Sequence, residues 1–363
     1  MPSINCAHPR LVKGATIAVA MSGGVDSSVT AALLKEQGYN VIGMFMKNWE
    51  ETIDGVCTTE QDATDVARVA HALEIPYYTV NFAENYRTEV FDLFLEELQK
   101  GNTPNPDILC NREIKFKLLL ESAIQLGADF LATGHYAQNS YKENYFTLLK
   151  GNDLDKDQSY FIYTLNQDVL SKVLFPIGHM KKKEVRHIAQ QLGLATATKK
   201  DSTGLCFIGE RNFRKFIHGY LGYTPGAFKR LDGTEVGTHH GVAYYTIGQR
   251  RGLAIGGKGE AWFVVGKDVP NNVVFVEQGA NHPALFASML VASAASWVKE
   301  APKLPCCRAK IRYRQTDQDC VIERIEEGKI YVRFPQPQRA ITPQQSIVFY
   351  NGMECLGGAI IES

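Results

Sequence analysis

The chain has 363 residues, of which 45% are hydrophobic and 21% are charged. It is long enough for two or three domains with separate cores, and its composition is that of an ordinary globular protein. The 39 basic residues equal the 39 acidic ones, so no global positive field attracts a polyanion, and any nucleic-acid surface has to come from local clusters.

Several local basic clusters stand out along the chain. They are Lys181-Lys182-Lys183, Lys199-Lys200, Arg211/Arg214/Lys215, Arg250-Arg251 and Arg308/Lys310/Arg312/Arg314. Each one alone is typical of a solvated surface, so none of them identifies an RNA-binding face by itself.

No apolar run reaches the roughly 18 residues needed to cross a bilayer. Residues 1–15 lack the hydrophobic core of a signal peptide. We therefore expect a cytoplasmic protein with no membrane partner. In a reducing cytosol the eight cysteines do not form a structural disulfide framework, and no two pairs show the double C-x-x-C spacing of a zinc site. We expect no metal site of this kind, and a functional cysteine should act as a reactive thiol.

In residues 16 to about 194, short apolar strands alternate with amphipathic helices. The predicted strands are 16–21, 41–46, 77–81 and 130–133, and the predicted helices are 27–37, 60–73, 85–100, 112–126 and 181–192. Gly38 and Gly101 follow two of the helices, where a left-handed cap favours glycine. This alternation is typical of an α/β fold with a doubly wound parallel sheet, which we assign to residues 1–212.

After about Phe213 glycine becomes frequent, and β-branched or aromatic residues alternate with polar ones. The alternating stretches are 242–247, 262–265, 308–313, 329–334 and 346–350. They predict a small, mostly β central domain over residues 213–286 and a compact C-terminal β-barrel over residues 287–363.

The first strand leads directly into a glycine- and serine-rich loop that opens a helix. Its sequence is Met21-Ser22-Gly23-Gly24-Val25-Asp26-Ser27-Ser28. Two glycines let the backbone approach an anion closely, the serine hydroxyls donate further hydrogen bonds, and the helix N-terminus adds a favourable dipole. The loop suits a pyrophosphate, although it lacks the lysine with which a Walker loop contacts the γ-phosphate of ATP.

The pattern S-G-G-x-D-S at a strand-to-helix junction resembles the PP-loop of the ATP pyrophosphatases, which split ATP between the α- and β-phosphates and leave AMP on a substrate oxygen. The fold implied is that of the adenine nucleotide alpha hydrolase-like proteins, with ATP and Mg²⁺ as cofactors. Asp26 resembles the residue that works with Mg²⁺, although an aspartate there is also a common helix cap. The implied nucleotide-binding residues are Ala20, Met21, Ser22, Gly23, Gly24, Val25, Asp26 and Ser27, together with Met46 and Gly134 at the carboxyl edge of the sheet.

Two cysteines lie in polar, basic surroundings. Cys110 follows the proline-stiffened stretch 103–107, and we expect it at or just before the first turn of a helix, near Arg112 and Lys115. The helix dipole and the two cations favour the thiolate, which is the nucleophilic form. Cys206 follows a glycine-containing turn and basic residues. For both, an inert packed cysteine remains the alternative.

Further motifs follow one another along the chain. They are Phe45-Met46-Lys47-Asn48-Trp49, T-P-N-P-D-x-L-C-N around Cys110, Thr133-Gly134-His135-Tyr136, Lys156-Asp157-Gln158-Ser159-Tyr160-Phe161, D-S-T-G-x-C-F-I-G-E around Cys206, and Arg312-Tyr313-Arg314-Gln315. Together with the loop they resemble the tRNA-specific 2-thiouridylases of the MnmA type, over essentially the whole chain from Thr16. The only visible departure is an N-terminal extension of about ten residues.

The resemblance implies a tRNA uridine 2-sulfurtransferase. Such an enzyme adenylates the C2 oxygen of the wobble uridine and then transfers sulfur from a cysteine persulfide, giving 2-thiouridine, AMP and pyrophosphate. Its partners would be tRNA and a sulfur-relay protein or cysteine desulfurase. Cys206 would carry the persulfide, and Cys110 would attack it to release hydrosulfide or end in a disulfide with Cys206. Asp107 would act as acid or base beside the uracil.

The same resemblance implies a set of RNA contacts. Asn105, Pro106 and Asp107 would contact the target base, and His135, Lys156, Asp157, Gln158, Arg312, Tyr313 and Gln345 would touch the tRNA. Simpler explanations stay open: a satisfied sheet-edge histidine for His135, a turn for Gln345 and an exposed strand for Arg312. Two other functions also stay open. One is a PP-loop amidotransferase or ligase that needs no thiol pair, and the other is a non-catalytic RNA-binding protein.

Overall fold

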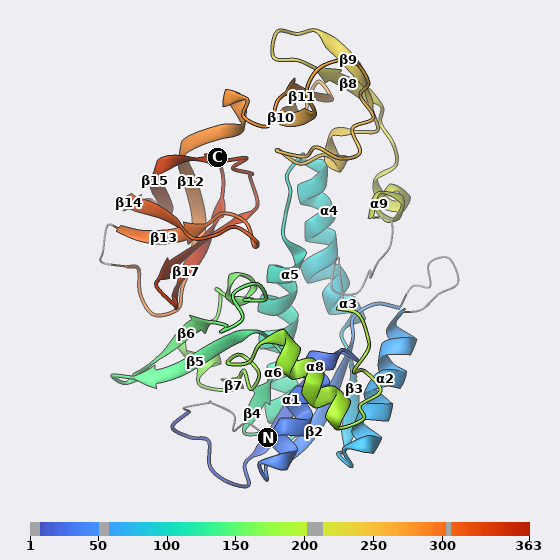
Figure 1. The fold of residues 1–363 in the computed structure, drawn as a ribbon, viewed down its shortest axis with the longest axis vertical. Helices are drawn as coiled ribbons and strands as arrows, with labels where there is room; N and C mark the ends of the chain where they lie inside the picture. Colours follow the sequence, from blue (N-terminus) through green and yellow to red (C-terminus); the bar gives the residue numbers. More distant parts are fainter. Residues whose placement is uncertain (1–7, 51–57, 202–212, 303–305) are drawn as a thin grey trace.

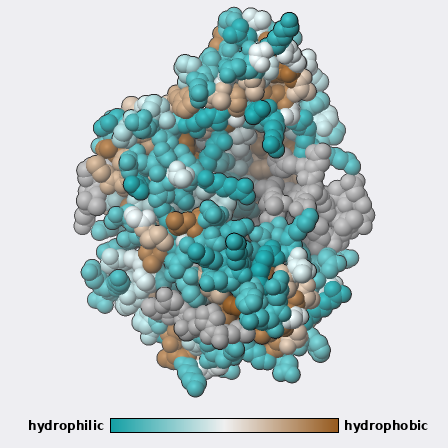
Figure 2. Space-filling model, in the orientation of Figure 1, coloured by the Kyte–Doolittle hydropathy of each residue, from teal (hydrophilic) through white to brown (hydrophobic). Residues whose placement is uncertain are grey.

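The computed structural model describes residues 8–50, 58–201, 213–302 and 306–363. Figure 1 shows a region of helices around a parallel sheet that contains the N-terminus, a small β region at the far end of the long axis, and a β-barrel beside them. Within the described ranges no helix has the length and apolar character needed to cross a membrane. The face seen in Figure 2 is mostly hydrophilic, with hydrophobic residues scattered in small groups.

The first region is built on a five-stranded parallel sheet with the order β3-β2-β1-β4-β7. Its strands are β1 (Thr16–Met21), β2 (Asn40–Lys47), β3 (Tyr77–Asn81), β4 (Phe130–Ala132) and β7 (Val173–Leu174). The central strand β1 alternates between two cores. Ile17, Val19 and Met21 belong to one cluster, and Ala18 and Ala20 belong to the other. A strand buried on both faces reads as a continuous apolar run, which is why β1 was predictable.

Helices cover both faces of this sheet. On one face lie α1 (Val25–Glu36) and α2 (Thr58–Ala72), and on the other lies the long helical stretch α5 (Pro106–Leu109), η2 (Cys110–Leu119) and α6 (Leu120–Gln125). The remaining helices of this region are α3 (Ala83–Tyr86), η1 (Arg87–Phe91), α4 (Asp92–Gln99), α7 (Gln167–Leu170), α8 (Lys182–Gln191) and the 3-10 turn η3 (Ser159–Phe161). The predicted α/β fold with a doubly wound parallel sheet is confirmed.

One helix begins earlier than its periodicity predicts. The expected start was residue 112, but the helical stretch begins at Pro106. Asn105 caps it, because its side-chain oxygen accepts a hydrogen bond from the Asp107 backbone N–H at 3.2 Å, and Pro106 takes the first helical position, where its missing N–H costs nothing. Cys110 therefore lies a full turn inside the helix, and its predicted place at or before the first turn is wrong.

The central region is a four-stranded sheet with the order β10-β11-β8-β9, preceded by α9 (Phe213–Leu221). The strands are β8 (Gly226–Lys229), β9 (Glu235–His239), β10 (Trp262–Asp268) and β11 (Val273–Gln278). The alternating stretch 242–247 is not a strand. It contains the 3-10 turn η4 (Val242–Tyr244), and Val242 and Tyr245, three residues apart, both pack into the core of this region.

The C-terminal region is a closed antiparallel barrel. Its strands are β12 (Phe286–Trp297), β13 (Cys306–Lys310), β14 (Gln318–Glu326), β15 (Lys329–Arg339), β16 (Ser346–Asn351) and β17 (Glu354–Ile361), and η5 (Pro283–Leu285) precedes them. They follow the order β12-β15-β14-β13-β16-β17, and pairing of β12 with β17 closes the ring. The predicted barrel is confirmed.

A hairpin of the first region joins this barrel. Its strands β5 (Ala137–Lys142) and β6 (Tyr145–Lys150) were not predicted, and β6 pairs antiparallel with β17 through Cys355 and Leu148. The barrel sheet thus continues into the polypeptide that follows β4, as Figure 1 shows. This contact ties the first and third regions together through backbone hydrogen bonds.

Candidate active site

Two glycines of the predicted nucleotide site are required by close backbone contacts. Gly23 has a φ of +71°, and a Cβ there would lie 2.8 Å from the backbone oxygen of Asp62. A Cβ on Gly134 would lie 2.8 Å from the backbone nitrogen of Ser27. Side chains are therefore excluded where β4 ends against the start of α1, and the structure brings Gly134 to the loop as the sequence predicted.

The loop is shaped by its own serine hydroxyls. The hydroxyls of Ser27 and Ser28 both donate to the backbone carbonyl of Gly24, at 3.1 and 2.8 Å. The backbone N–H of Ser22 donates to the Ser27 hydroxyl at 3.2 Å, and the Thr196 hydroxyl donates to that of Ser28 at 3.0 Å. These bonds hold the turn in shape, which is the preorganisation that an anion site needs.

The other predicted loop residues turn their side chains into the core. Ala20, Met21 and Val25 are 8%, 2% and 4% exposed, so only their backbone atoms are available to a ligand. Met46 lies next to them at the carboxyl end of β2, where it packs partly against two hydrophobic clusters. Recognition of a phosphate chain by backbone N–H groups is compatible with this burial.

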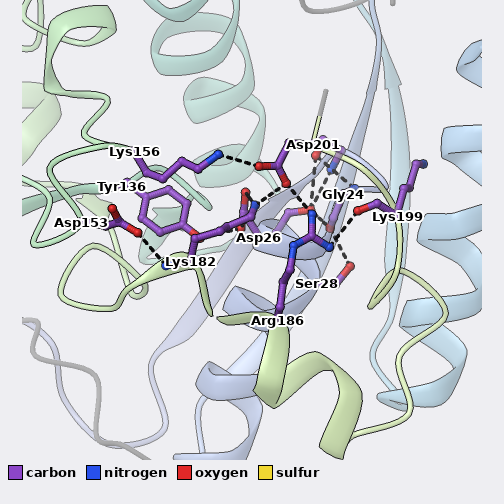
Figure 3. A network of polar contacts seen from close by, with 12 residues as sticks. Gly24, Asp26, Ser28, Tyr136, Asp153, Lys156, Lys182, Arg186, Lys199 and Asp201 are labelled. Atoms are coloured by element: carbon purple, nitrogen blue, oxygen red, sulfur yellow. Dashed lines mark hydrogen bonds and ion pairs between the residues drawn. The ribbon is translucent and has the colours of Figure 1, made fainter. Parts of the chain in front are cut away.

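The loop carboxylate Asp26 is held by two distant side chains. The Tyr136 hydroxyl donates to its Oδ1 at 2.8 Å, and the Lys182 ammonium donates to both of its oxygens at 2.8 Å, from 156 residues further along the chain (Figure 3). Burial raises the pKa of Tyr136, and the negative charge of Asp26 raises it further, so the phenol stays protonated and remains a donor. Asp26 is thus a positioned anion rather than only a helix cap.

A second carboxylate, Asp201, lies beside the first and is surrounded by three cations. Lys182 and Arg186 contact its Oδ1 at 2.8 and 2.6 Å, and Lys156 contacts its Oδ2 at 2.8 Å (Figure 3). Partial burial opposes ionisation of Asp201, but hydrogen bonds from Lys156 and Lys182 outweigh it and hold the pKa of the carboxyl well below its usual value. Asp201 is therefore ionised at any physiological pH.

Sequence reasoning missed Lys182, Arg186 and Asp201. Lys182 was read as part of a solvated basic run, yet only 11% of its side chain is exposed. One signal was available. Lys182 is the first residue of α8, and a cation at a helix N-terminus opposes the helix dipole unless an anion offsets it.

Cys110 is not the activated thiol that the sequence predicted. It is 1% exposed and belongs to an apolar cluster with Trp49, Tyr86, Val90, Phe91, Phe94, Leu98, Ile114, Phe216 and Ile217. Burial raises the pKa of the thiol to about 11, an effect that Lys115 opposes and Asp107 reinforces. The predicted thiolate is therefore wrong for this conformation, because the longer helix turns Cys110 inward. Met46, at the carboxyl end of β2, packs against the same cluster, so the cluster reaches the edge of the sheet where the nucleotide is predicted to bind.

The helix that carries Cys110 faces the barrel across a small cavity. This cavity of about 180 Å³ is lined by Asn105, Ile108 and Arg112 on one side and by Gln344 and Ser346 on the other. Asp107 is half-buried in the first turn of the same helix. The N-P-D stretch therefore lies at the junction of two regions, as a base-binding loop would. Cys206, the second predicted thiol, lies outside the described residues.

Two predicted RNA contacts are internal in this structure. His135 is buried, its Nδ1 lies 2.8 Å from the Thr133 hydroxyl, and burial together with Lys115 lowers its pKa well below the ordinary value, so the ring is neutral. Asp157 is also buried. It accepts hydrogen bonds at 3.1 Å from the backbone N–H groups of Gly151 and Ser159. Gln158, its neighbour, accepts one from the backbone of Tyr136.

The C-terminal RNA candidates mostly contact other parts of the protein. Arg312 donates to the backbone oxygens of Ile247 and Ala340 at 2.8 and 3.0 Å and to the Thr342 hydroxyl at 2.9 Å, so it connects the central region to the barrel. Two more make contacts between regions: the side-chain amide of Gln345 donates to the backbone oxygen of Thr103 at 2.6 Å, and the ring of Tyr313 packs on that of Phe161 at 4.3 Å.

The described residues contain no group of three or more histidine, cysteine, aspartate or glutamate side chains placed to hold a metal ion. Asp26 and Asp201 nevertheless contact the same ammonium group of Lys182 at 2.8 Å, so both carboxylates face one small volume. Mg²⁺ is usually bound through one or two carboxylates plus substrate phosphates, and Asp26, which belongs to the loop itself, fits that donor set.

Models of known families match three successive parts of the chain. Residues 15–210 match the tRNA methyl transferase HUP domain, residues 214–278 the tRNA methyl transferase PRC-barrel domain, and residues 287–361 the aminomethyltransferase beta-barrel domain. A protein of Protochlamydia amoebophila (strain UWE25), named tRNA-specific 2-thiouridylase MnmA, is 63% identical over 96% of this chain and 93% of its own length. The chain belongs to the tRNA-specific 2-thiouridylase family.

Other members of the 2-thiouridylase family are similar over the same extent. The Exiguobacterium sibiricum and Listeria innocua proteins are 55% and 56% identical, each over 96% of this chain and 94% of their own length. Among solved structures, the U34-tRNA thiolase NcsA from Methanococcus maripaludis is 22% identical, with a TM-score of 0.36 over 54% of this chain and 63% of its own, which is too distant to carry an argument. The predicted membership of the 2-thiouridylase family is thus confirmed, while the roles of single residues stay predictions.

Proposed function

We propose that the chain is a tRNA uridine 2-sulfurtransferase that adenylates the C2 oxygen of the wobble uridine with ATP and replaces that oxygen with sulfur. The observation that carries the proposal is a preformed pyrophosphate loop in a chain of the 2-thiouridylase family. The C2 oxygen of uracil is a poor leaving group, and transfer of AMP to it turns it into a good one. Sulfur then adds to C2 and AMP departs, leaving 2-thiouridine.

The phosphate chain of ATP would lie along the loop from Ser22 to Ser27, with Met46 and Gly134 bordering the nucleotide. Support comes from the close contact of Gly134 with the start of α1 and from the hydroxyl bonds that shape the turn. Mg²⁺ would neutralise phosphate charge during adenylation, and Asp26 would hold it. The buried phenol of Tyr136 keeps Asp26 oriented through its hydrogen bond at 2.8 Å.

Sulfur would be delivered by Cys206, loaded as a persulfide by a sulfur-relay protein or a cysteine desulfurase. Attack of the Cys110 thiolate on the inner sulfur forms a Cys110–Cys206 disulfide and expels hydrosulfide, which adds to C2. The Cys110 proton must leave first, and Asp107, three residues earlier in the same helical stretch, would accept it. Cys206 follows Asp201 by five residues, and a tether of that length spans at most about 18 Å.

The tRNA would bind across all three proposed domains, residues 1–212, 213–286 and 287–363. The target base has to leave the anticodon stack, at a cost of a few kcal/mol that backbone contacts must offset. The cavity between the N-P-D stretch and the barrel would take part in holding that base. Exposed side chains of the basic clusters, such as Arg250 and Arg251, would contact RNA phosphates, so binding should weaken steeply with salt.

Mass spectrometry of nucleosides from tRNA incubated with the enzyme, ATP and a sulfur source tests this function. Wild-type protein should produce 2-thiouridine together with AMP and pyrophosphate. Cys206→Ser should make no 2-thiouridine while tRNA-dependent AMP formation persists. Cys306→Ser, which changes an exposed barrel cysteine, should behave like wild type. Full thiolation by Cys206→Ser would refute the persulfide assignment, and absence of AMP with wild-type protein would refute adenylation.

A further inference from the structure

The phosphate loop has a group of cations beside it that the loop sequence does not contain. We call the side chains of Lys156, Lys182, Arg186 and Asp201 the Asp201 cluster. Its three cations all lie within 2.8 Å of the Asp201 carboxylate, and Lys182 also lies 2.8 Å from the loop residue Asp26. A Walker loop supplies a phosphate-binding lysine from its own sequence. Here a lysine reaches the loop from a different helix.

Packing, rather than the ion pairs, fixes the two cations of α8. Lys182 and Arg186 are four residues apart and therefore share one face of the helix. The neighbouring face carries Val185, Ile188 and Ala189, which are buried with residues of α1 in one hydrophobic cluster. Because this core sets α8 against α1, the cations would keep their places beside the loop if the Asp201 carboxylate moved away.

The cluster is built to hold an anion. Lys182 is the first residue of α8, and both of its neighbours, Lys181 and Lys183, are also basic. Positive side chains at a helix N-terminus oppose the dipole, and they repel one another, so negative charge among them stabilises the arrangement. In this structure the negative charge is supplied by Asp26 and Asp201.

A carboxylate in such a position is chemically similar to part of a phosphate group. Both oxygens of Asp201 are engaged, Oδ1 by Lys182 and Arg186 and Oδ2 by Lys156. Arg and Lys side chains bind phosphate oxygens through the same charge-assisted hydrogen bonds. Since 32% of the Asp201 side chain and 41% of the Lys156 side chain are exposed, the carboxylate can be exchanged for an anion from solution.

We propose that Lys156, Lys182 and Arg186 form the cationic half of the ATP phosphate site and that Asp201 occupies this half until a phosphate group displaces it. The inference rests on the proposed function, because it assumes that the loop binds ATP. Lys182 would supply the phosphate-binding lysine that the loop sequence lacks. Asp201 precedes Cys206 by five residues, so the exchange links phosphate binding to the chain that carries the proposed persulfide.

Equilibrium binding of α,β-methylene-ATP with Mg²⁺, measured by calorimetry on the full chain, tests the proposal. This analogue cannot be cleaved between its α- and β-phosphates, so binding is read without turnover. Arg186→Gln should weaken binding about 10-fold and Lys182→Gln at least as much, since each removes a charge-assisted contact. Asp201→Asn keeps the shape but removes the competing charge, and it should tighten binding about 3- to 10-fold.

Lys183→Gln is the matched control, because Lys183 lies in the same first turn but is exposed. It should bind like wild type, and inorganic pyrophosphate used as a second probe should rank all the variants in the same order. Equal binding by Arg186→Gln and Lys183→Gln would show that Arg186 is not part of a phosphate site. Unchanged or weaker binding by Asp201→Asn would show that the Asp201 carboxylate does not compete with phosphate for the cations. Wild-type protein that binds neither probe and makes no AMP with tRNA would instead refute the proposed function, and this inference with it.

Discussion

The phosphate loop and the segment that leads to Cys110 lie in the same region of the molecule but are held by different partners. The loop is held from within that region, by Thr196 on Ser28 and by Lys182 on Asp26. The segment 101–110 is held by the other two regions. Lys267 and Gln345 donate to the backbone oxygens of residues 101 and 103, each at 2.6 Å.

The phosphate loop and Cys110 also differ in their chemical surroundings. Asp26 is in hydrogen-bond contact with a protonated phenol and an ammonium group, which is the arrangement that charged phosphates require. Cys110 is buried among aromatic side chains with its pKa raised to about 11, so it is neither exposed nor ionised. The loop is thus arranged to bind phosphates, whereas the sulfur transfer proposed for Cys110 would require a rearrangement. The ties from segment 101–110 to the barrel and the central region offer a route by which bound tRNA can cause it.

The largest effect that this contrast predicts is at Asp26. Asp26→Asn keeps the shape of the side chain but removes the charge that faces Lys182 and the proposed metal. We expect tRNA-dependent AMP formation to fall about 100- to 1,000-fold, the usual loss when a preorganised electrostatic contact is removed. AMP release measured by chromatography checks this. Asp232→Asn, an exposed carboxylate of the central region, is the control and should be unaffected. Near-normal AMP release from Asp26→Asn would mean that the loop is not the reacting site.

The second effect concerns the thiol. With a pKa of about 11, only about one Cys110 side chain in a thousand is ionised at pH 8, and burial slows its reaction further. Alkylation by iodoacetamide, followed by peptide mass spectrometry, should therefore be at least about 100-fold slower at Cys110 than at an ordinary exposed thiol. The exposed Cys306 provides the internal reference.

Bound substrate should change this result. If tRNA opens the cluster, adding tRNA with the uncleavable ATP analogue should accelerate alkylation of Cys110 and leave that of Cys306 unchanged. The direction of the pH effect is fixed as well. The thiolate fraction rises about tenfold for each pH unit below 11. Rapid labelling of Cys110 at pH 7 in the free protein would contradict the buried, protonated state.

The sequence predicted what depends on neighbours along the chain. Strands β1 to β4 and the glycine-rich loop were found because apolar runs and turn chemistry appear in local patterns, whereas the two-residue strand β7 was missed. The hairpin β5–β6 was missed although its strands are neighbours along the chain, and only its attachment to the barrel depends on pairing with β17 near the other end of the chain. The roles of Lys182 and Asp201 depend on a tertiary contact: the position of Lys182 at the start of α8 indicates an anion nearby, but it does not say which one. Cys110 was misjudged because the cap at Asn105 starts the helical stretch at residue 106 instead of the predicted residue 112.

Arg312 offers a test of how the barrel is joined to the central region. Arg312→Met removes the donor to the Ile247 carbonyl and to the Thr342 hydroxyl, and it leaves the Ala340 carbonyl with the Thr342 hydroxyl alone. We expect a loss of about 2–4 kcal/mol in the free energy of unfolding. Arg314→Met, its exposed neighbour, is the matched control and should change stability little. Thermal unfolding of both variants beside wild type measures the difference.

The salt dependence of tRNA binding separates this structural role from an RNA contact. A side chain that neutralises one phosphate contributes about 0.7 to 0.9 to the slope of log K against log salt. We expect the slope to be unchanged in Arg312→Met, because its guanidinium is already occupied by protein acceptors. A slope reduced by about that amount, with normal stability, would restore Arg312 as a phosphate contact.

The smallest effect is the pH dependence caused by Lys267, which holds the start of the Cys110 segment. Burial lowers the pKa of its ammonium group to about 8 from an ordinary value of 10.5. Between these two values the unfolded chain binds the proton more readily than the folded one, so this residue makes stability rise with pH in that window. From pH 8 to 9.5 the difference in unfolding free energy between wild type and Lys267→Met should shift by about 1–2 kcal/mol in favour of wild type. Parallel thermal unfolding of the two proteins across this pH range measures it, and subtraction removes the other titrating groups. Curves that stay parallel would show that Lys267 is not buried as a cation, and that the Cys110 segment is held to the central region more loosely than the hydrogen bond to Gly101 implies.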